Sequence, residues 1–161
     1  MDASLRWHDE VVMNPLIRHA PDPDHPGWWT WDLAGEARYN STIGKLLVRA
    51  EGPGRARCRM FPETLQSNLG DFVHGGAILT FIDMTLFAGG RLAGISDISH
   101  SVTLDLSCQF IDAGHLHVPL DCPVELLRET GRLAFLRGTV EQDGRIVAAW
   151  SGTLRKGGER R

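Results

Sequence analysis

The sequence has no apolar run of the roughly 18 residues that a membrane-spanning helix needs. Residues 1–10 are acidic and contain no apolar core of signal-peptide length. We therefore expect a cytoplasmic protein that does not associate with a membrane.

Neither basic nor acidic residues are in large excess. The 17 Lys and Arg residues are balanced by 20 Asp and Glu residues, which gives a net charge of -3. The only dense run of charge is the short tail at 155–161, which we expect to be solvated. Because nucleic-acid phosphates require a dense basic face, the composition argues against nucleic acid as a partner.

Cysteine is also infrequent. Cys58, Cys108 and Cys122 are odd in number and too scattered for a disulfide framework or a zinc knuckle, which indicates a reducing compartment. His115 and His117 lie on one side of an extended segment, but they have no third ligand at matching spacing. We therefore predict no metal and no cofactor.

Length and composition indicate one globular domain. The chain has 161 residues, of which 42% are hydrophobic and 23% charged, enough to bury a single core. Strand-like patterns begin near residue 43, so we place the domain at 43–156. A helical or loop extension at 1–42 precedes it, and a tail at 157–161 follows it.

The extension is irregular. The pattern allows an amphipathic helix over 5–17, followed by the proline-rich segment 21–27, which neither a helix nor a strand tolerates. Trp28, Trp29 and Trp31 come directly after it. Three neighbouring tryptophans are either a cap packed on the open side of the core or a platform for a ligand.

Tight turns connect most of the predicted strands. The pair 45–50 and 55–61 surrounds a glycine-rich turn, and Asp143-Gly144 is the strongest hairpin signal in the chain. Strands joined in this way must be antiparallel neighbours. The remaining strands are predicted at 101–111, 118–129, 133–142 and 145–155.

The segment 101–111 alternates cleanly between apolar and polar residues. Its apolar positions include Val102, Leu104 and Leu106. Thr103 therefore falls on the polar face, away from the face that we expect to pack on the core.

One segment predicts a helix rather than a strand. Residues 75–88 are apolar on every side of the helical wheel, and Gly89-Gly90 follows as a stop signal. A helix that is apolar all round must be covered all round. We therefore predict an α+β fold in which a curved antiparallel sheet of five to six strands wraps around one long central helix.

Asp83 lies within this apolar helix, between Ile82 and Met84. An ionised carboxylate in such surroundings carries a desolvation cost. Asp83 is either a structural carboxylate bonded to a hydroxyl such as that of Thr80 or Thr85, or a general base or nucleophile whose pKa is raised toward neutrality.

His74-Gly75-Gly76 stands at the start of the same helix. Its unpaired backbone N–H groups and the positive end of the helix dipole are suited to an oxyanion, although two glycines there would equally ease close packing. His74 and Asp83 are separated by about 13 Å along the helix and lie on roughly opposite faces. If both act in one reaction, the site must form twice in a homodimer with antiparallel helices.

The segment Asn68–Gly76, NLGDFVHGG, followed by Asp83 and by the strand near Thr103, resembles the hotdog-fold acyl-CoA thioesterases of the phenylacetate-pathway (PaaI-like) type. The resemblance covers roughly residues 43–156. It implies a hotdog domain that forms a homodimer or a dimer of dimers and hydrolyses acyl-CoA without any cofactor beyond the coenzyme A of the substrate.

The resemblance also implies roles for single residues. Asp83 is similar to the catalytic carboxylate, which acts as general base on water or attacks directly to give an anhydride. Gly75 is similar to the glycine whose N–H polarises the thioester carbonyl, and His74 supports that turn. Asn68 looks like the residue that places the water or the thioester, and Thr103 falls where a serine or threonine assists the water in relatives.

Two other functions remain open at this stage. Related hotdog proteins hydrate or dehydrate acyl thioesters with a histidine and a carboxylate, here His74 and Asp83. A binding protein for an acyl or aromatic ligand is the alternative that the three tryptophans favour. The acyl group is also undetermined, since Phe72, Phe81 and Phe87 are pocket or core residues.

Coenzyme A carries several negative charges, so a weakly acidic protein needs local basic residues to bind its phosphates. The candidates are Arg128, Arg132, Arg137, Arg145, Arg155 and Lys156.

Overall fold

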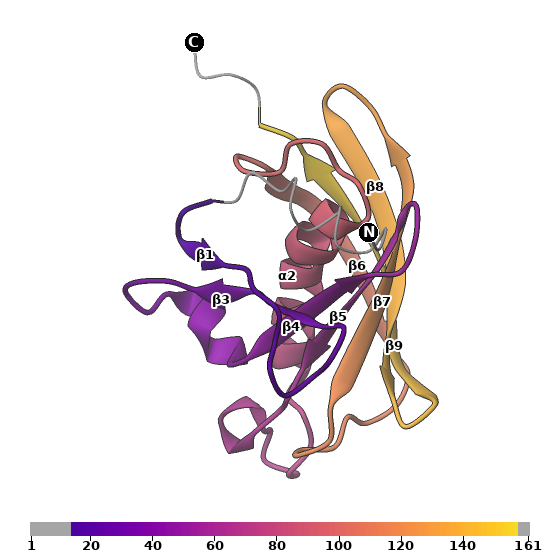
Figure 1. The fold of residues 1–161 in the computed structure, drawn as a ribbon. Coiled ribbons are helices and arrows are strands. Elements are labelled where there is room, and N and C mark those ends of the chain that lie inside the picture. The colour runs from indigo at the N-terminus through magenta and orange to yellow at the C-terminus, as the bar shows by residue number, and fades with distance from the viewer. Residues whose placement is uncertain (1–13, 158–161) are drawn as a thin grey trace.

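A computed structural model of the protein describes residues 14–157. In it, a seven-stranded antiparallel sheet curves around the helix α2, Gly75–Leu92 (Figure 1). The strand order is β2-β4-β5-β7-β8-β9-β6, so β2 and β6 form the two edges. The other elements are β1 (Ile17–Arg18), β2 (Trp29–Thr30), β3 (Asp32–Leu33), η1 (Tyr39–Ile43), β4 (Leu46–Ala50), β5 (Arg55–Met60), η2 (Thr64–Gln66), β6 (Val102–Phe110), β7 (Leu120–Glu129), β8 (Leu133–Gln142) and β9 (Arg145–Arg155).

The six predicted strands correspond to β4 through β9, and their turns use the expected residues. Gly52 and Gly54 have φ angles of 108° and 71° in the turn between β4 and β5. Asp143 and Gly144, with φ of 50° and 75°, have the positive φ pair that a tight two-residue hairpin requires. Local turn chemistry therefore sets the three hairpin pairings β4–β5, β7–β8 and β8–β9 of the sheet.

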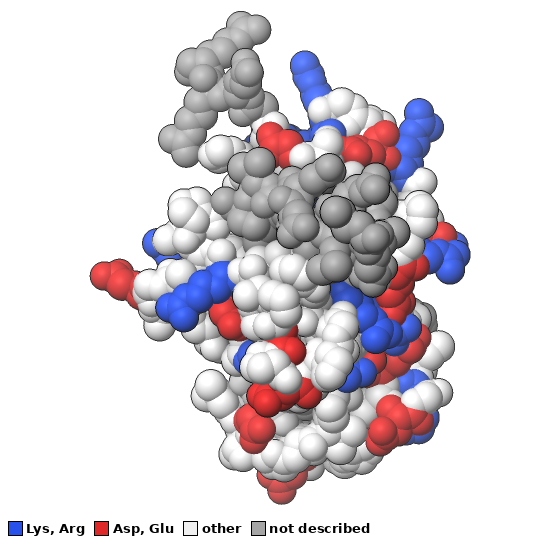
Figure 2. Space-filling model, in the orientation of Figure 1, with Lys and Arg blue, Asp and Glu red and all other residues white. Residues whose placement is uncertain are grey.

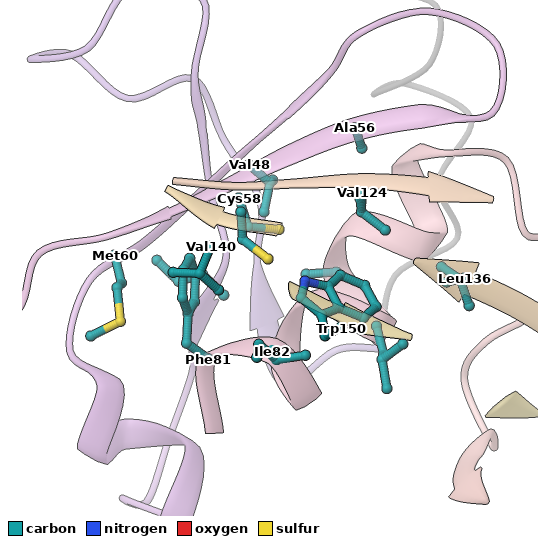
Figure 3. Packing of buried hydrophobic residues seen from close by; sticks show 14 of the residues in the cluster. Val48, Ala56, Cys58, Met60, Phe81, Ile82, Val124, Leu136, Val140 and Trp150 are labelled. Carbon is teal, nitrogen blue, oxygen red and sulfur yellow. The ribbon is translucent and has the colours of Figure 1, made fainter. Parts of the chain in front are cut away.

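The inner face of the sheet packs on α2. Phe81, Ile82 and Leu86 of the helix are fully buried, and apolar side chains from the strands point toward the first two in Figure 3. These strand residues include Val48, Met60, Val124, Leu136, Val140 and Trp150. The arrangement is the predicted hotdog fold, with one strand more than expected because β2 pairs with β4.

The helix does not stop at Gly89-Gly90, as predicted, but continues to Leu92. A Cβ atom on Gly89 would lie 2.6 Å from Val124 Cγ1, and one on Gly90 would lie 2.8 Å from Ile95 Cδ1. Both distances are shorter than a carbon–carbon contact allows. The two glycines therefore serve close packing of the helix on the sheet rather than helix termination.

The prediction that α2 is covered all round is also wrong for the described chain. Gly76 and Leu79 are exposed, and Thr80, Asp83 and Phe87 are half-buried, on the side of the helix that faces away from the sheet. We call this set of five residues the open face of α2.

The N-terminal segment packs against the sheet. The helix expected over 5–17 lies largely outside the described residues, and Ile17–Arg18 form β1 instead. Trp28 is only 5% exposed, and the guanidinium carbons of Arg49 and Arg59 each lie 4.5 Å from its ring centroid. The cations over its ring leave Trp28 little room to serve as a ligand platform. Trp29 and Trp31, which are partly buried, are the two tryptophans of this segment that pack against the core.

The outer face of the sheet carries ion pairs. Arg57 lies 2.8 Å from Glu51, and Arg59 lies 2.6 Å from Asp121. On the face drawn in Figure 2, acidic and basic residues are interspersed. No helix within residues 14–157 combines the length and the apolar character that a membrane crossing requires.

We expect Gly89→Ala to destabilise the protein. Alanine gains about 1 kcal/mol of helix propensity, but overpacking against Val124 costs about 1–3 kcal/mol, so Tm in thermal denaturation should fall. Gly131→Ala is the matched control, since a Cβ there meets nothing within 4 Å. An unchanged Tm for Gly89→Ala would show that the helix can move away from the sheet at no cost.

Candidate active site

His74 caps the N-terminus of α2. Its Nδ1 accepts a hydrogen bond of 2.8 Å from the Gly76 N–H, so this nitrogen carries no proton in the bonded state. Of the two glycine N–H groups that were predicted to be unpaired, the one of Gly76 is therefore bonded. Among the described residues, no group accepts a hydrogen bond from the Gly75 N–H, which is left for an external acceptor at the positive end of the helix.

The ring of Phe110 lies beside Gly75. A Cβ atom on Gly75 would be 3.4 Å from Phe110 Cζ, an ordinary van der Waals contact. This contact was not predicted, since Phe110 only continues the apolar alternation of its strand. The backbone N–H of Gly75 therefore lies beside an aromatic side chain.

The loop before α2 is held by Gln66, a buried residue that the sequence did not single out. Its Oε1 accepts from the Glu63 N–H at 2.7 Å, its Nε2 donates to the Thr42 carbonyl at 2.6 Å, and its own carbonyl accepts from the His74 N–H at 2.7 Å. A buried polar side chain with all these partners fixes the approach to the helix.

Asn68 organises the turn that follows. Its Oδ1 accepts hydrogen bonds from the N–H groups of Gly70 at 2.8 Å and Phe72 at 3.1 Å. Asn68 therefore has the role of a turn residue. This role does not exclude contact with a substrate or water, because the Nδ2 amide protons remain as donors. The carbonyl oxygen is fixed by two bonds, which also fixes the direction in which this NH₂ group points.

Asp83 accepts a hydrogen bond from Thr103. The Thr103 Oγ1 lies 2.7 Å from Asp83 Oδ1, across a sequence separation of 20 residues. This contradicts the expectation that Thr103 faces away from the helix. The alternation breaks at a bulge between Thr103 and Asp105, so Leu104 is an extra residue and Thr103 falls on the helix side.

The two hydroxyls named for the structural alternative do not bond to Asp83; the hydroxyl that does is that of Thr103. Thr80 Oγ1 donates to the Gly76 carbonyl at 2.8 Å, and Thr85 Oγ1 donates to the Phe81 carbonyl at 2.9 Å. Neither hydroxyl is bonded to the carboxylate. Asp83 is half-buried on the open face rather than enclosed in the core, so water and a substrate can reach it.

The structure thus brings the predicted residues together in two groups. Asp83 and Thr103 form one, and Asn68, His74 and Gly75 form the other at the start of the helix. Because α2 is continuous between them, they are about 13 Å apart along its axis. One described chain does not supply both groups to a single reacting atom.

The cysteines are not suited to nucleophilic chemistry. Cys58 and Cys122 are buried register partners on β5 and β7. Burial raises the pKa of the Cys58 thiol to about 12 and also raises that of Cys122. Burial raises the pKa of Cys108 as well. All three therefore remain thiols near neutral pH, and a thiol is a far weaker nucleophile than a thiolate.

Within residues 14–157, no three His, Cys, Asp or Glu side chains come together in a way that could hold a metal ion. His115 lies edge-on to Phe72, and His117 Nδ1 lies 3.0 Å from Glu63. Both histidines thus have local partners.

Two hollows lie over β5, β7 and β8 rather than over the open face of α2. They measure about 500 Å³ and about 300 Å³, and both are lined by charged residues that include Arg57. Neither is lined by Asp83 or Gly75.

Comparison with known proteins identifies the fold. Residues 70–149 match the family model described as Thioesterase superfamily. No curated protein matches the sequence.

Three solved structures illustrate the similarity. Mouse thioesterase superfamily member 2 superimposes with a TM-score of 0.64 at 17% identity, covering 74% of this chain and 87% of that one. The Escherichia coli PaaI protein of the phenylacetic acid degradation operon gives 0.63 at 15%, covering 73% and 83%. A hypothetical thioesterase from Streptococcus pneumoniae, solved with coenzyme A, gives 0.63 at 19%, covering 74% and 94%.

We expect His74→Ala to reduce the free energy of unfolding by about 1 kcal/mol, because the Gly76 N–H loses its acceptor. His74→Asn should retain most of the stability, since asparagine is a good N-cap residue and the backbone at 74 is already extended. Urea unfolding measures both variants. Equal stabilities of the two would mean that the cap is not the stabilising contribution of His74.

Proposed function

We propose that this chain, whose hotdog domain matches the thioesterase superfamily over residues 70–149, is an acyl-CoA thioesterase of the phenylacetate-pathway type. The observation that carries the proposal is the carboxylate of Asp83, held by Thr103 on the open face of α2. The free Gly75 N–H at the start of the same helix is the complementary group.

The site is completed by a second copy of the chain. If two α2 helices lie antiparallel about a two-fold axis, with Gly75 of one opposite Asp83 of the other, both sites form at once. The edge strand β6 supports such a dimer, because Phe110, whose ring lies beside Gly75, is 51% exposed. Val102 and Leu104 of the same edge strand are 42% and 55% exposed.

In this arrangement the thioester carbonyl accepts the Gly75 N–H of one subunit and lies against Asp83 of the other. Thr103 engages Oδ1, so Oδ2 is free to take a proton from water as the water attacks the carbonyl carbon; collapse of the tetrahedral species then breaks the C–S bond, and the thiolate takes that proton. If Oδ2 instead attacks the carbonyl carbon itself, loss of the thiolate leaves an anhydride on Asp83, which a water hydrolyses to the acid, regenerating the carboxylate and supplying the proton for the thiolate. One water and one acyl-CoA give one acid and one free thiol.

The expected contributions are adequate for an activated ester. One backbone donor to the oxyanion supplies roughly 3 kcal/mol, and a positioned base supplies about 10²- to 10⁴-fold. The Asn68 NH₂ group, whose direction is fixed by its own turn, places the water or the thioester.

The structure bears on the two alternatives. A hydratase would use His74 and Asp83 as proton-transfer groups; the cap occupies His74 Nδ1 and leaves only Nε2 for that role, so the products formed from an enoyl thioester must distinguish it from the thioesterase. A ligand platform at Trp28 is disfavoured because Trp28 is buried between Arg49 and Arg59.

The structure narrows the choice of residues for the phosphates of coenzyme A. Arg137, Arg145 and Lys156 are paired with Glu125, Asp112 and Glu129. Among the described residues, the other three candidates make no ion pair within 4 Å; they are Arg128, Arg132 and Arg155. All three lie at the end of the sheet where β6 starts, and Arg155 is the register partner of Val102, next to Thr103.

Asp83→Asn should lower thiol release from acyl-CoA by at least about 10²-fold while Tm is retained, because the base is lost without a change in shape. Asp143→Asn, in the β8–β9 hairpin, is the matched control and should behave as wild type. Release is followed with a thiol reagent. Wild-type rates in Asp83→Asn would remove the proposed mechanism, and hydration of an enoyl thioester without thiol release would favour the hydratase.

Arg132→Glu and Arg155→Glu should raise KM for acyl-CoA about tenfold or more, because each replaces a phosphate contact with repulsion. The same variants should not alter KM for N-acetylcysteamine thioesters, which lack the nucleotide. Arg145→Glu, at the opposite end of β9, is the control. Equal effects on both substrate types would contradict phosphate binding at this end of the sheet.

A further inference from the structure

Tyr39 connects the N-terminal segment to the open face of α2. Its hydroxyl lies 3.1 Å from Thr80 Oγ1, although the two residues are 41 positions apart. The side chain is 71% exposed, so its position is not explained by burial in the core. Tyr39 also precedes residues 70–149, the part of the chain that matches the thioesterase family.

The direction of this hydrogen bond follows from its neighbour. Thr80 has a single hydroxyl proton, which it donates to the Gly76 carbonyl at 2.8 Å. Tyr39 must therefore donate its own proton to Thr80. The phenol is thus tied down by its polar end, and the ring presents an apolar surface beside the helix.

The backbone that carries Tyr39 is fixed as well. Thr42 Oγ1 donates to the Tyr39 carbonyl at 2.7 Å, and the Thr42 carbonyl accepts from Gln66 at 2.6 Å. Ile43, at the end of η1, is 1% exposed and belongs to the core. An exposed aromatic ring anchored at both its hydroxyl and its backbone is preorganised for contact with another molecule.

The anchor of the Tyr39 ring lies on the same side of α2 as the carboxylate. Thr80 precedes Asp83 by three residues, so both lie on the same side of α2. Thr103 approaches Asp83 from β6, whereas Tyr39 approaches Thr80 from η1. The open face near Asp83 is thus bordered by side chains of two elements, β6 and η1.

The space between α2 and the sheet is not available to an acyl group bound at Asp83. Phe81, Ile82 and Leu86 fill the space between α2 and the sheet with 0% exposure. The acyl group must therefore extend along the open face, where the exposed Tyr39 ring is anchored through Thr80.

We propose that Tyr39 is a specificity-determining residue, whose ring forms one wall of the acyl site and sets the length and bulk of the apolar acyl group that is accepted. This inference rests on the proposed thioesterase function. It gives the N-terminal segment a part in substrate selection, through a contact that the family match does not include.

The test compares wild type, Tyr39→Phe and Tyr39→Ala on short, medium and long straight-chain acyl-CoAs and on a bulky aryl acyl-CoA. Removing the wall in Tyr39→Ala should change the ratio of kcat/KM between long and short substrates by about tenfold, chiefly through KM. The value of kcat for the shortest substrate should stay near wild type. Tyr39→Phe keeps the ring but loses the anchor, so its shift should be in the same direction and smaller.

Ile146→Ala, an exposed apolar residue on β9, is the matched control and should leave the profile unchanged. Tm and the sedimentation coefficient of each variant separate a wall from a structural or interface residue. Equal losses on every substrate in Tyr39→Ala, with a lower Tm or a dissociated dimer, would overturn the inference. So would an unchanged profile.

The outcome is separable from that of the proposed function. Thiol release by wild type with no change of profile in Tyr39→Ala overturns only the role of Tyr39. The absence of thiol release from every substrate by wild type overturns the proposed function, and the specificity role falls with it.

Discussion

Close packing of α2 on the sheet is the constraint on which the rest of the molecule depends. Gly89 brings the end of the helix so near to Val124 of β7 that even a methyl group would collide, and a Cβ on Gly90 would lie 3.3 Å from Leu136 of β8. Large apolar side chains fill the space along the rest of this contact. Because one side of α2 is occupied in this way, its opposite side faces outward, and Asp83 lies on that side.

The polar groups of the candidate site have one feature in common. In each, local structure occupies one atom and leaves another for chemistry. The cap at His74 uses the Gly76 N–H and leaves that of Gly75; the Asn68 turn uses Oδ1 and leaves the NH₂ group. Thr103 bonds to one oxygen of Asp83 and leaves the second. Such groups are oriented before substrate arrives, which is the main requirement for electrostatic catalysis.

Much of the fold could be predicted because the information is local. The period of two in β4 through β9, and turn residues such as Asp143-Gly144, specify extended segments and their antiparallel neighbours without reference to distant parts of the chain. The candidate residues were likewise recognisable from a short motif and its spacing. Predictions failed where contacts between distant parts of the chain determine the local structure. At Gly89-Gly90, glycine is needed because the sheet lies so close to the helix, and not because the helix ends there. At Leu104, pairing with β9 produces a bulge that the alternation of apolar and polar residues does not reveal.

The sequence by itself determined the class of fold, the positions of the main strands along the chain and the identity of the acidic and backbone groups proposed for the chemistry. These follow from periodicity, turn preference and a compact motif, each of which acts within a few residues. Only the tertiary structure decided the order of the strands in the sheet, that Thr103 faces Asp83, that one glycine N–H remains free and that Tyr39 bonds to Thr80. Such contacts join residues up to 41 positions apart, and their geometry exists only once the sheet has curved around the helix.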